Sequence, residues 1–511
     1  MSDSIYSGLQ IARNGTSVPV FKNGRTFLSA YNPERDAENF ITAHNDAFSG
    51  TGCILTGGIG NGLHIELLLQ KYKNAKIIAF EADEESLAFS LSAVSKALLS
   101  EACSGQNRLI LTCAEKLQQD LLTNYIPALD GNFAFAAVRS WSDYLGEKAA
   151  SFITLINNTI SEISADYSVQ AQFGKLWHRN ILINLSLYDT INPEQIFDAG
   201  KYVPHAKKAA ITGAGPSLDT DIPKIRENRS EYCIFATDTS FSTLTAAGIT
   251  PDFVVTVDSQ QISEKHFVGQ SLKGTVLACD LTGNCSIVEN AIAQNASILL
   301  FHNNHPLSQL ADSWLDETKN ATSPFPLIDS GAGTVLHAAT DLARKLGFTN
   351  LSFFGADFSY SQGKPYVKGT YLEKLYYAEE ARTGNAQTAY SRLMYRTPLI
   401  QLDEQHSTTE VLSRYKNALE SFLKQKPEPL NIAESPSKLH GNHDDNPLFQ
   451  DFIPWYLEKL QKNDKKVLFS LLPLAAWYKK NNSDADTECV YAFAEQLTAN
   501  VGRIQCRRHK K

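Results

Sequence analysis

The sequence lacks the features that mark zinc-binding, secreted and membrane-spanning proteins. None of its eight cysteines stands in a C-x-x-C pair, so neither a zinc site nor a disulfide framework is indicated. The longest apolar run, Val467–Tyr478, is interrupted by Ser470 and Pro473 and is shorter than the roughly 20 residues of a membrane span. The first residues carry no basic segment followed by an apolar one, which is the pattern of a secretory signal. We therefore expect a cytoplasmic protein with reduced cysteines.

An excess of positive charge is absent as well. Lysine and arginine number 47 against 55 acidic residues, which gives a formal net charge of −8 and no overall basic surface for nucleic acid. The contents of 43% hydrophobic and 20% charged residues are typical of a soluble globular protein. At 511 residues the chain is too long for one ordinary core, and we expect about three domains.

The first clear motif is a glycine loop between two expected strands. The order is a strand at Cys53–Thr56, the loop GGIGNG at 57–62, a helix at His64–Tyr72, a strand at Lys76–Phe80 and then Glu81. This is the first βαβ unit of a doubly wound sheet, and an acid at the end of the second strand can bind a ribose. The predicted site, a possible second nucleoside site, consists of Gly57, Gly58, Gly60 and Glu81. The spacing resembles that of S-adenosylmethionine-dependent methyltransferases, but no acidic-aromatic catalytic tetrad follows, so a fold without a ligand is the alternative.

A second alternation of strands and helices begins near residue 207. Six strands are expected, at Ala209–Thr212, Tyr232–Thr237, Phe253–Val257, Thr275–Cys279, Ser297–Phe301 and Leu351–Phe354. Crossover connections between them predict a second parallel sheet. The fold class is therefore α/β, with two doubly wound, Rossmann-like parallel-sheet domains followed by a helical C-terminal region. The predicted boundaries are 1–195, 196–390 and 391–511.

The stretch ITGAGPSLD, after the first strand of this sheet, predicts a strand, a glycine turn and a helix start. Gly213 and Gly215 permit close approach of the backbone to a ligand, Pro216 favours a first helical turn, and Ser217 offers a hydroxyl. The amino end of a helix binds anions, so a phosphate is the expected ligand, and a plain turn is the alternative.

Other polar residues follow the strands at the same edge of the sheet. Asp238 and Asp258 come after the second and third strands, and Asp357 after the last. A second glycine turn precedes the expected helix Val335–Lys345 and supplies Ser330, Gly331 and Thr334 as a second anion or ribose contact. No DxD pair lies nearby, which argues against an obligatory divalent cation. In the alternative, the three aspartates converge and hold one.

The segments on either side also carry patterns. Trp177, Asn180 and Asn184 in WHRNILINL share one helical face, for which hydrogen bonding to backbone is the commoner role and ligand binding the alternative. Several tyrosines, Tyr360 and Tyr366 among them, crowd a region that we interpret as a flap over the strand ends.

The segments GAGPSLD, ATDTSFSTLTAAGITPDFVVTVD and SGAGTVLHAATDLARKLGFTNLSFFGADFSY together resemble the motility-associated factor (Maf) flagellin glycosyltransferases. Their central domain belongs to the 6-hydroxymethylpterin diphosphokinase-like group and is distantly similar to bacterial sialyltransferases that use CMP-sialic acid. The likeness spans about residues 207–360 in order, and WHRNILINL resembles the segment that leads into that domain.

The resemblance implies transfer of a nonulosonic acid, of the pseudaminic or legionaminic type, from its CMP-activated form to Ser or Thr of flagellin, needed for flagellar assembly and motility. The two glycine turns would hold the nucleotide, Asp238 and Asp258 would bind ribose or base hydroxyls, and Tyr360 and Tyr366 would meet the departing phosphate. The partners would be flagellin and the nucleotide sugar.

The general base is not assigned by the sequence. His302, His305 and His406 are candidates, His406 by its position after the flap, and Asp258 and Asp357 complete the set of catalytic candidates. Three alternative functions stay open: a pterin diphosphokinase, a non-catalytic flagellin-binding factor and, from the loop at 57–62, a methyltransferase.

Overall fold

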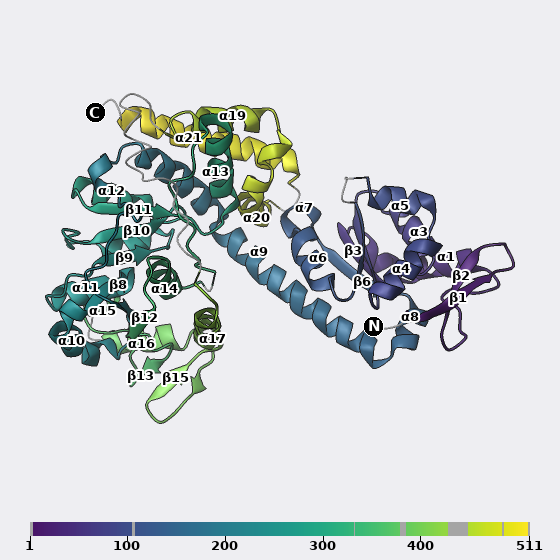
Figure 1. The fold of residues 1–511 in the computed structure, drawn as a ribbon, viewed down its shortest axis with the longest axis horizontal. Coiled ribbons are helices and arrows are strands. Elements are labelled where there is room, and N and C mark those ends of the chain that lie inside the picture. Colours follow the sequence, from purple (N-terminus) through teal and green to yellow (C-terminus); the bar gives the residue numbers. More distant parts are fainter. Residues whose placement is uncertain are drawn as a thin grey trace. The chain divides into compact units, whose positions relative to one another are not determined.

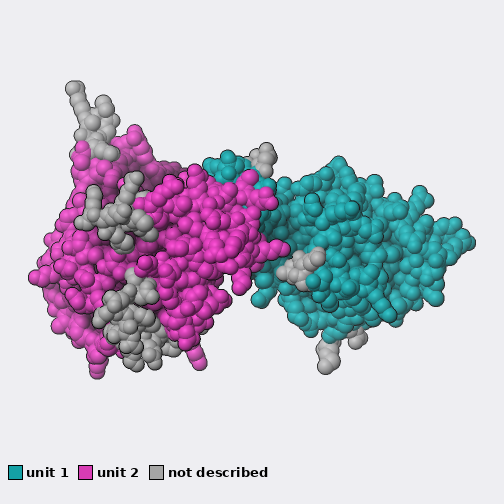
Figure 2. All heavy atoms as spheres, turned by 90° about the horizontal axis from the view of Figure 1, so that it is seen from above, with its two compact units in different colours: residues 1–172, 475–487 teal, residues 173–474, 488–511 magenta. Residues whose placement is uncertain are grey.

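The chain forms two compact units in this computed structural model (Figure 2), which describes residues 4–104, 108–331, 333–378, 385–427, 448–482 and 485–508. Unit 1 consists of residues 1–172 and 475–487, and unit 2 of residues 173–474 and 488–511. Helix α9 (Glu147–Tyr188) contributes its first part to unit 1 and its last part to unit 2. In the described ranges, no helix is both long and apolar enough to cross a membrane. The boundaries expected at 195 and 390 stay a prediction.

Unit 1 contains the first parallel sheet predicted from the sequence. Its strands are β3 (Cys53–Gly57), β4 (Lys76–Glu81), β5 (Leu109–Cys113) and β6 (Phe133–Ala137), in the order β5-β4-β3-β6. The intervening helices are α3 (Leu63–Lys71), α4 (Glu84–Ala93), α5 (Lys96–Ala102) and α6 (Leu117–Asn124). The central strands β3 and β4 are almost wholly buried because helices cover both faces of such a sheet.

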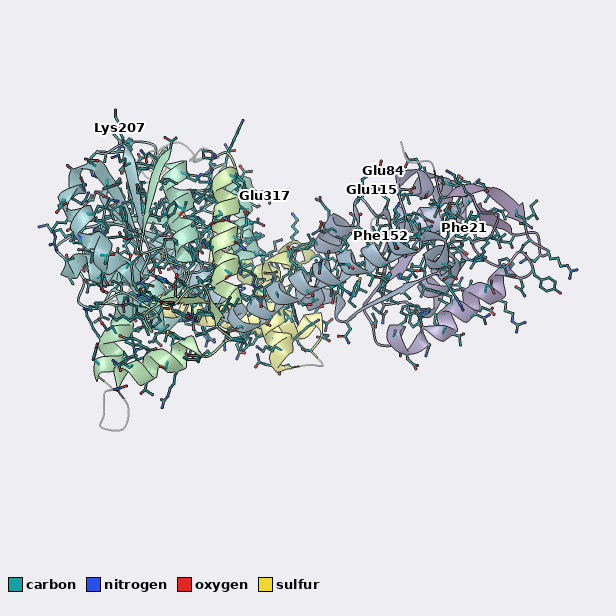
Figure 3. The ribbon with its side chains drawn as sticks, turned by 90° about the horizontal axis from the view of Figure 1, so that it is seen from below. Phe21, Glu84, Glu115, Phe152, Lys207 and Glu317 are labelled. Carbon is teal, nitrogen blue, oxygen red and sulfur yellow. The ribbon has the colours of Figure 1, made fainter. Side chains whose placement is uncertain are left out.

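An antiparallel hairpin precedes this sheet and packs on it. It consists of β1 (Tyr6–Ile11) and β2 (Ser17–Phe21). Phe21, labelled in Figure 3, is fully buried and stacks on Tyr6 and Tyr144. Helix α1 (Pro33–Ala43) follows, with Asn32 as its N-cap, and helix α8 (Arg139–Leu145) leads into α9. The hairpin thus completes the core around the carboxyl end of β4.

Unit 2 contains the second predicted sheet, whose six parallel strands have the order β11-β10-β9-β8-β7-β12. They are β7 (Lys208–Thr212), β8 (Tyr232–Thr237), β9 (Phe253–Thr256), β10 (Val276–Asp280), β11 (Ser297–Phe301) and β12 (Asn350–Phe354). The expected strands lie within one residue of these bounds at each end. The predicted α/β fold class with two parallel sheets is confirmed.

Helices cover both faces of the second sheet (Figure 1). They are α10 (Leu218–Glu227), α11 (Asp238–Ala246), α12 (Cys285–Ala293), α13 (Pro306–Lys319) and α14 (Val335–Lys345). Ala209 and Ile211 pack with α14 residues such as Leu342, while Ala210 packs with Leu218 of α10 on the other face. Alternate strand residues point to opposite faces, which is why one strand serves two helical layers.

The two asparagines of WHRNILINL anchor α9 to the carboxyl ends of β9 and β10. Asn180 donates hydrogen bonds to the carbonyl oxygens of Ser259 and Thr282, at 3.1 and 3.0 Å. Asn184 donates to those of Leu281 and Gly283, at 2.9 and 3.1 Å. The backbone-binding role expected for these buried amides is what the structure shows, and α9 covers this part of the strand ends.

The C-terminal part of the chain is helical, as predicted. Its helices are α15 (Tyr371–Ala378), α16 (Ala386–Met394), α17 (Glu410–Lys424), α19 (Phe452–Gln461), α20 (Leu472–Asn481) and α21 (Thr487–Arg508). A small antiparallel sheet lies before α17, with the order β13-β15-β14: β13 (Tyr360–Ser361), β14 (Ile400–Gln401) and β15 (His406–Thr408). It carries the region that the sequence indicated as a flap.

A partly buried carboxylate, Asp189 just after α9, holds the segment that leads into α19, and its raised pKa predicts that the stability of unit 2 depends on pH. It accepts hydrogen bonds from the backbone N–H groups of Leu448 and Phe449, and burial raises its pKa to about 7. Its folded pKa lies above the unfolded one, so this group favours folding at low pH and stability falls as pH rises through about 4 to 7.

We expect Asp189→Asn to stabilise unit 2 by ~2 kcal/mol at pH 8 and by less than half of that at pH 5, where most of the native Asp189 is still protonated. The amide keeps an oxygen that accepts both N–H groups and carries no charge to bury. Urea unfolding of both proteins at the two pH values measures this. A stability difference that is the same at pH 5 and pH 8 would contradict the assignment.

Candidate active site

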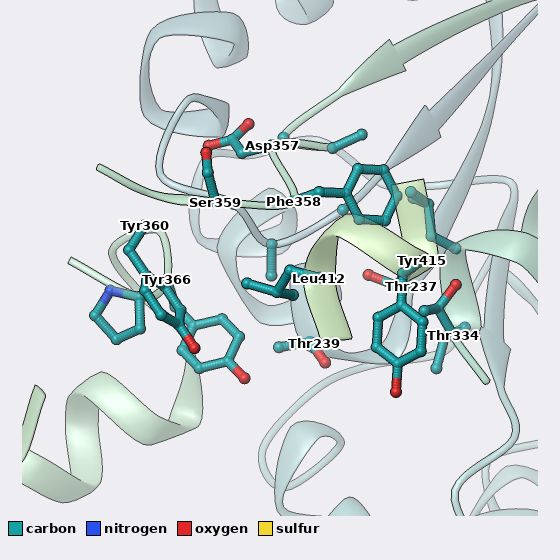
Figure 4. A pocket seen from close by; sticks show the side chains of 18 of the residues that line it. Thr237, Thr239, Thr334, Asp357, Phe358, Ser359, Tyr360, Tyr366, Leu412 and Tyr415 are labelled. Carbon is teal, nitrogen blue, oxygen red and sulfur yellow. The ribbon is translucent and has the colours of Figure 1, made fainter. Parts of the chain in front are cut away.

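The candidate site lies where the chain reverses its direction of travel across the second sheet. From β7 the chain adds β8 on one side and later places β12 on the other, and ligands in open α/β sheets bind beyond the carboxyl ends at this switch point. A cavity of about 310 Å³ occupies this position (Figure 4). Its lining comes from six segments: Gly213–Gly215, Thr237 with Thr239, Gly333–Leu336, Gly355–Tyr360, Pro365 with Tyr366, and Leu412 with Tyr415.

The first glycine turn forms one wall of the cavity. A Cβ atom at Gly213 would lie 2.5 Å from the Gly355 carbonyl oxygen, and one at Gly215 would lie 2.6 Å from the Asp357 Cγ. Both distances are far below a van der Waals contact, so only glycine fits where the turn after β7 meets the loop after β12. These glycines approach another loop of the chain closely, whereas their predicted approach to a ligand stays a prediction.

The amino end of α10 already holds a carboxylate. Asp357 accepts hydrogen bonds from the Ser217 backbone N–H, at 2.9 Å, and from the Ser217 hydroxyl. A side-chain anion thus sits where the sequence indicated a phosphate, which agrees with the preference of helix amino ends for negative charge. Asp357 lines the cavity, whereas Pro216 and Ser217 lie just outside its lining.

The second glycine turn presents the other helix end. Thr334 is the N-cap of α14 and accepts from the His337 backbone N–H at 3.2 Å. Gly333, Thr334, Val335 and Leu336 all line the cavity, so the first turn of this helix faces it. Ser330 and Gly331 make hydrogen bonds within the turn. The Ser330 carbonyl oxygen accepts from the Gly333 N–H, and the Gly331 N–H donates to the Asp329 carboxylate. An anion in the cavity would meet this helix end rather than that of α10.

Tyrosine hydroxyls supply further donors. Figure 4 shows Tyr360 and Tyr366 on one side of the cavity and Tyr415 with Thr334 on the other. Burial raises the pKa of Tyr366 to about 12, with smaller contributions from neighbouring tyrosines and Asp238, and burial also raises the pKa of Tyr360. Both phenols therefore keep their protons at neutral pH and can donate hydrogen bonds.

The two other predicted aspartates lie beside the cavity and not in its lining. Asp238 is buried and accepts hydrogen bonds from the Thr256 hydroxyl, at 2.8 Å, and from the Thr239 backbone N–H, at 2.6 Å. Asp258 accepts from the Gln260 backbone N–H, and burial raises its pKa. Thr237 and Thr239, the neighbours of Asp238, are the residues that reach the cavity from this side.

A metal centre formed by Asp238, Asp258 and Asp357 is not found among the residues that the structure describes. The group there whose ligand atoms all lie within 4.8 Å of one another is His205, Cys233 and Asp252. Arg229 donates to Asp252 at 3.0 Å, and its fixed positive charge disfavours a cation at that place. The expectation that no divalent cation is obligatory stays a prediction.

The histidines considered from the sequence lie away from the cavity lining. His302 follows β11 and lies 3.3 Å from Asp312, and His305 is the N-cap of α13 and contacts Trp177 edge-on. His406 is half-exposed and its Nδ1 lies 2.8 Å from Asp403. A different histidine, His266, also lies outside the lining; it is buried beside Tyr371, and the negative charges of Asp238 and Asp258 act on it. Because it lies in a short 3₁₀ turn with no motif, no sequence pattern indicates it.

The glycine loop of unit 1 is filled by its own chain. A Cβ atom at Gly60 would lie 2.3 Å from the Phe27 ring, and Cβ atoms at Gly57 and Gly58 would lie 2.9 and 2.8 Å from Trp141. Glu81 is fully buried, and its carboxylate accepts hydrogen bonds from side chains and from backbone N–H groups of the loop. A nucleoside at the predicted second site would have to displace these groups.

We expect Gly215→Ala to lower the stability of unit 2 by ~2 kcal/mol and to weaken binding of CMP. The new methyl group must push Asp357 away from Ser217 and into the cavity. Thermal unfolding with and without CMP measures both effects. Gly8→Ala is the control, since no atom lies within 4 Å of its added Cβ, and equal behaviour of the two variants would contradict this packing.

Comparisons with known proteins identify a family domain in unit 2, which contains this cavity. Residues 179–363 match the family described as 6-hydroxymethylpterin diphosphokinase MptE-like. An uncharacterized protein of Treponema pallidum (strain Nichols) is 34% identical over 184 residues, which cover 36% of this chain and 81% of that protein. The chain belongs to this MptE-like family. A second uncharacterized protein of the same organism is 30% identical over 199 residues, 38% of this chain and 65% of that protein.

A solved structure resembles the fold of the MptE-like chain over nearly its whole length. The structure of a Maf glycosyltransferase from Magnetospirillum magneticum AMB-1 matches 97% of this chain and 85% of its own, with a TM-score of 0.54 and 13% identity. The resemblance to Maf proteins with a pterin-diphosphokinase-like central domain is thus confirmed, in its family domain by the sequence match and in its fold by the structural match.

Proposed function

We propose that this MptE-like chain is a glycosyltransferase that moves a nonulosonic acid from a CMP-activated donor to Ser or Thr hydroxyls of flagellin. The observation that carries the proposal is the cavity at the switch point, which joins the amino end of α14 to the phenols of Tyr360 and Tyr366. The fold shared with a Maf glycosyltransferase supports the same class of reaction.

The lining suits a nucleotide monoester. The α14 amino end and the phenols donate hydrogen bonds toward an anion, while Leu336, Phe358 and Leu412 supply apolar surface for a base or ribose. Asp357 is held by Ser217 at the far wall, so a ligand phosphate would avoid that wall and approach α14. About 310 Å³ is at the lower end of ligand pockets, which suits one nucleotide with its sugar extending toward the flap.

In the reaction, the acceptor oxygen forms a bond to the anomeric carbon of the sugar as the bond from that carbon to the CMP phosphate oxygen breaks. The electron pair of the broken bond leaves with CMP, and the acceptor hydroxyl loses its proton to a base. The charge that develops on the departing phosphate is stabilised by preorganised donors, here the α14 amino end and the phenols of Tyr360 and Tyr366. These donors carry out the role that a divalent cation has in other transferases.

Intact-mass measurement of flagellin tests the proposal. Co-expression with flagellin and a CMP-nonulosonate source should add whole nonulosonic acid residues to flagellin, and CMP should raise the melting temperature of the purified chain, since a ligand of the folded state alone stabilises it. An unchanged flagellin mass together with no effect of CMP would contradict the proposal. A flagellin that binds the chain without gaining mass would instead identify a non-catalytic binding factor.

A pterin diphosphokinase is the second candidate, because the family that matches residues 179–363 is described by that activity. Stabilisation of the chain by ATP with a hydroxymethylpterin, and none by CMP, would favour it. Location in the cytoplasm and a need for the protein in flagellar assembly and motility are part of the first proposal, and loss of motility on deletion of the gene tests them.

A further inference from the structure

A group of titratable side chains lies next to the cavity and has no role in the scheme above. Asp238 begins α11, Asp258 follows β9, His266 ends the 3₁₀ turn η3 (Gln261–His266), and Tyr371 begins α15. We call these four residues the acid–histidine cluster. They come from four separate elements that meet at the carboxyl ends of β8 and β9, so the tertiary fold alone assembles them.

His266 is the central member of the acid–histidine cluster. Its side chain is 8% exposed, and its ring lies edge-on to Tyr371 with 4.5 Å between the ring centroids. Its Nδ1 atom is buried and has no hydrogen-bond partner among the described residues. Buried polar atoms in native proteins are nearly always paired, so this ring nitrogen has a hydrogen-bonding position that a ligand or water can take.

The charges around His266 suit a group that accepts a proton. Burial lowers the pKa of His266, which keeps the ring neutral at neutral pH, while the negative charges of Asp238 and Asp258 act in the opposite direction. These two carboxylates therefore stabilise the imidazolium once it forms. A neutral imidazole whose charged form is stabilised by nearby carboxylates is suited to general-base catalysis.

The acid–histidine cluster adjoins the cavity at Asp238 and Tyr371, which lie close to residues of the lining. Thr237 and Thr239 flank Asp238 along the chain, and both line the cavity. Tyr366, another lining residue, feels the charges of Asp238 and Tyr371. The cluster therefore lies near the phenol of Tyr366, beside the cavity.

We propose that His266 is the general base that removes the proton from the acceptor hydroxyl, and that the acid–histidine cluster marks the acceptor side of the site. This inference rests on the proposed glycosyl transfer. The acceptor oxygen bonds to the anomeric carbon, the electron pair of the broken bond leaves with CMP, and the proton passes to the His266 imidazole and then to solvent. Asp238 and Asp258 position the ring and stabilise its charged form.

The test compares His266→Gln and His266→Ala with His205→Gln as the control. His205 lies at the amino ends of the strands of the same sheet, is half-exposed and lies 3.7 Å from Asp252. Transfer to flagellin is measured by intact mass at saturating donor, and CMP binding by thermal shift. We expect both His266 variants to lose about a hundredfold in kcat, in the range for loss of a general base, while their stabilisation by CMP is kept. Added imidazole should restore part of the activity of His266→Ala.

Transfer by His266→Gln within twofold of wild type would overturn the assignment and leave the proposed function standing. No transfer by wild type would overturn the proposed function and the assignment with it. If the variants lose CMP stabilisation and far-ultraviolet circular dichroism together, imidazole rescue of the folded fraction decides: a rescued rate supports the base, and an unchanged rate contradicts it.

Discussion

Replacing Glu81 with alanine is expected to destabilise unit 1 by about 5 kcal/mol, the largest change in stability that the structure indicates. Its carboxylate is fully buried and is the common acceptor of five donors at 2.8 to 3.0 Å: the Tyr6 and Ser90 hydroxyls, the Ile59 and Gly60 N–H groups, and the Trp141 indole N–H. Removal of the acceptor leaves several of these donors unpaired in the core, and each buried unpaired donor costs ~1–3 kcal/mol.

Hydrogen exchange of the β3 and β4 amides measures the effect of Glu81→Ala. Glu84→Gln is the matched control, since this side chain is 61% exposed, pairs with Lys116 and lies at the surface of unit 1 (Figure 3). Exposed ion pairs contribute little, so we expect the control to change stability by less than ~0.5 kcal/mol. Equal protection in the two variants would mean that water satisfies the five donors, and that Glu81 is open to a ribose after all.

The parallel sheets could be predicted because their signals are local. Buried strands such as Tyr232–Thr237 are mostly apolar, and glycine or polar residues mark where such strands end. The backbone-binding role of Asn180 and Asn184 could also be predicted, since their helical spacing places both amides on one face. The sequence therefore predicts that the site lies at the carboxyl ends of the strands.

The contacts between side chains at these strand ends could not be predicted, because they join residues far apart along the chain. The sequence indicated a phosphate at Ser217, but the structure places there the carboxylate of Asp357, 140 positions away. Pairing of that kind has no local pattern. His266 was missed for a related reason: a histidine in a short turn acquires a role only through Asp238, Asp258 and Tyr371, which three other elements bring to it.

Tyr366→Phe is expected to lower kcat for glycosyl transfer by roughly 10²–10³-fold with little change in KM, as for loss of one donor that binds the developing charge. Burial raises the pKa of this phenol to about 12, so the hydroxyl stays protonated and its position in the cavity lining lets it donate to a departing phosphate. The phenylalanine ring keeps the packing, so the loss measures the hydroxyl alone.

Kinetics of transfer to flagellin at saturating and limiting donor separate kcat from KM for Tyr366→Phe. Tyr395→Phe is the control, because Tyr395 is 71% exposed and lies outside the cavity lining, and it should keep wild-type kinetics. A rise in KM at unchanged kcat would mean that Tyr366 binds the donor equally well before and during bond breaking. In that event the stabilisation of the phosphate would fall to Tyr360 and the α14 amino end, and Tyr360→Phe would then carry the larger loss in kcat.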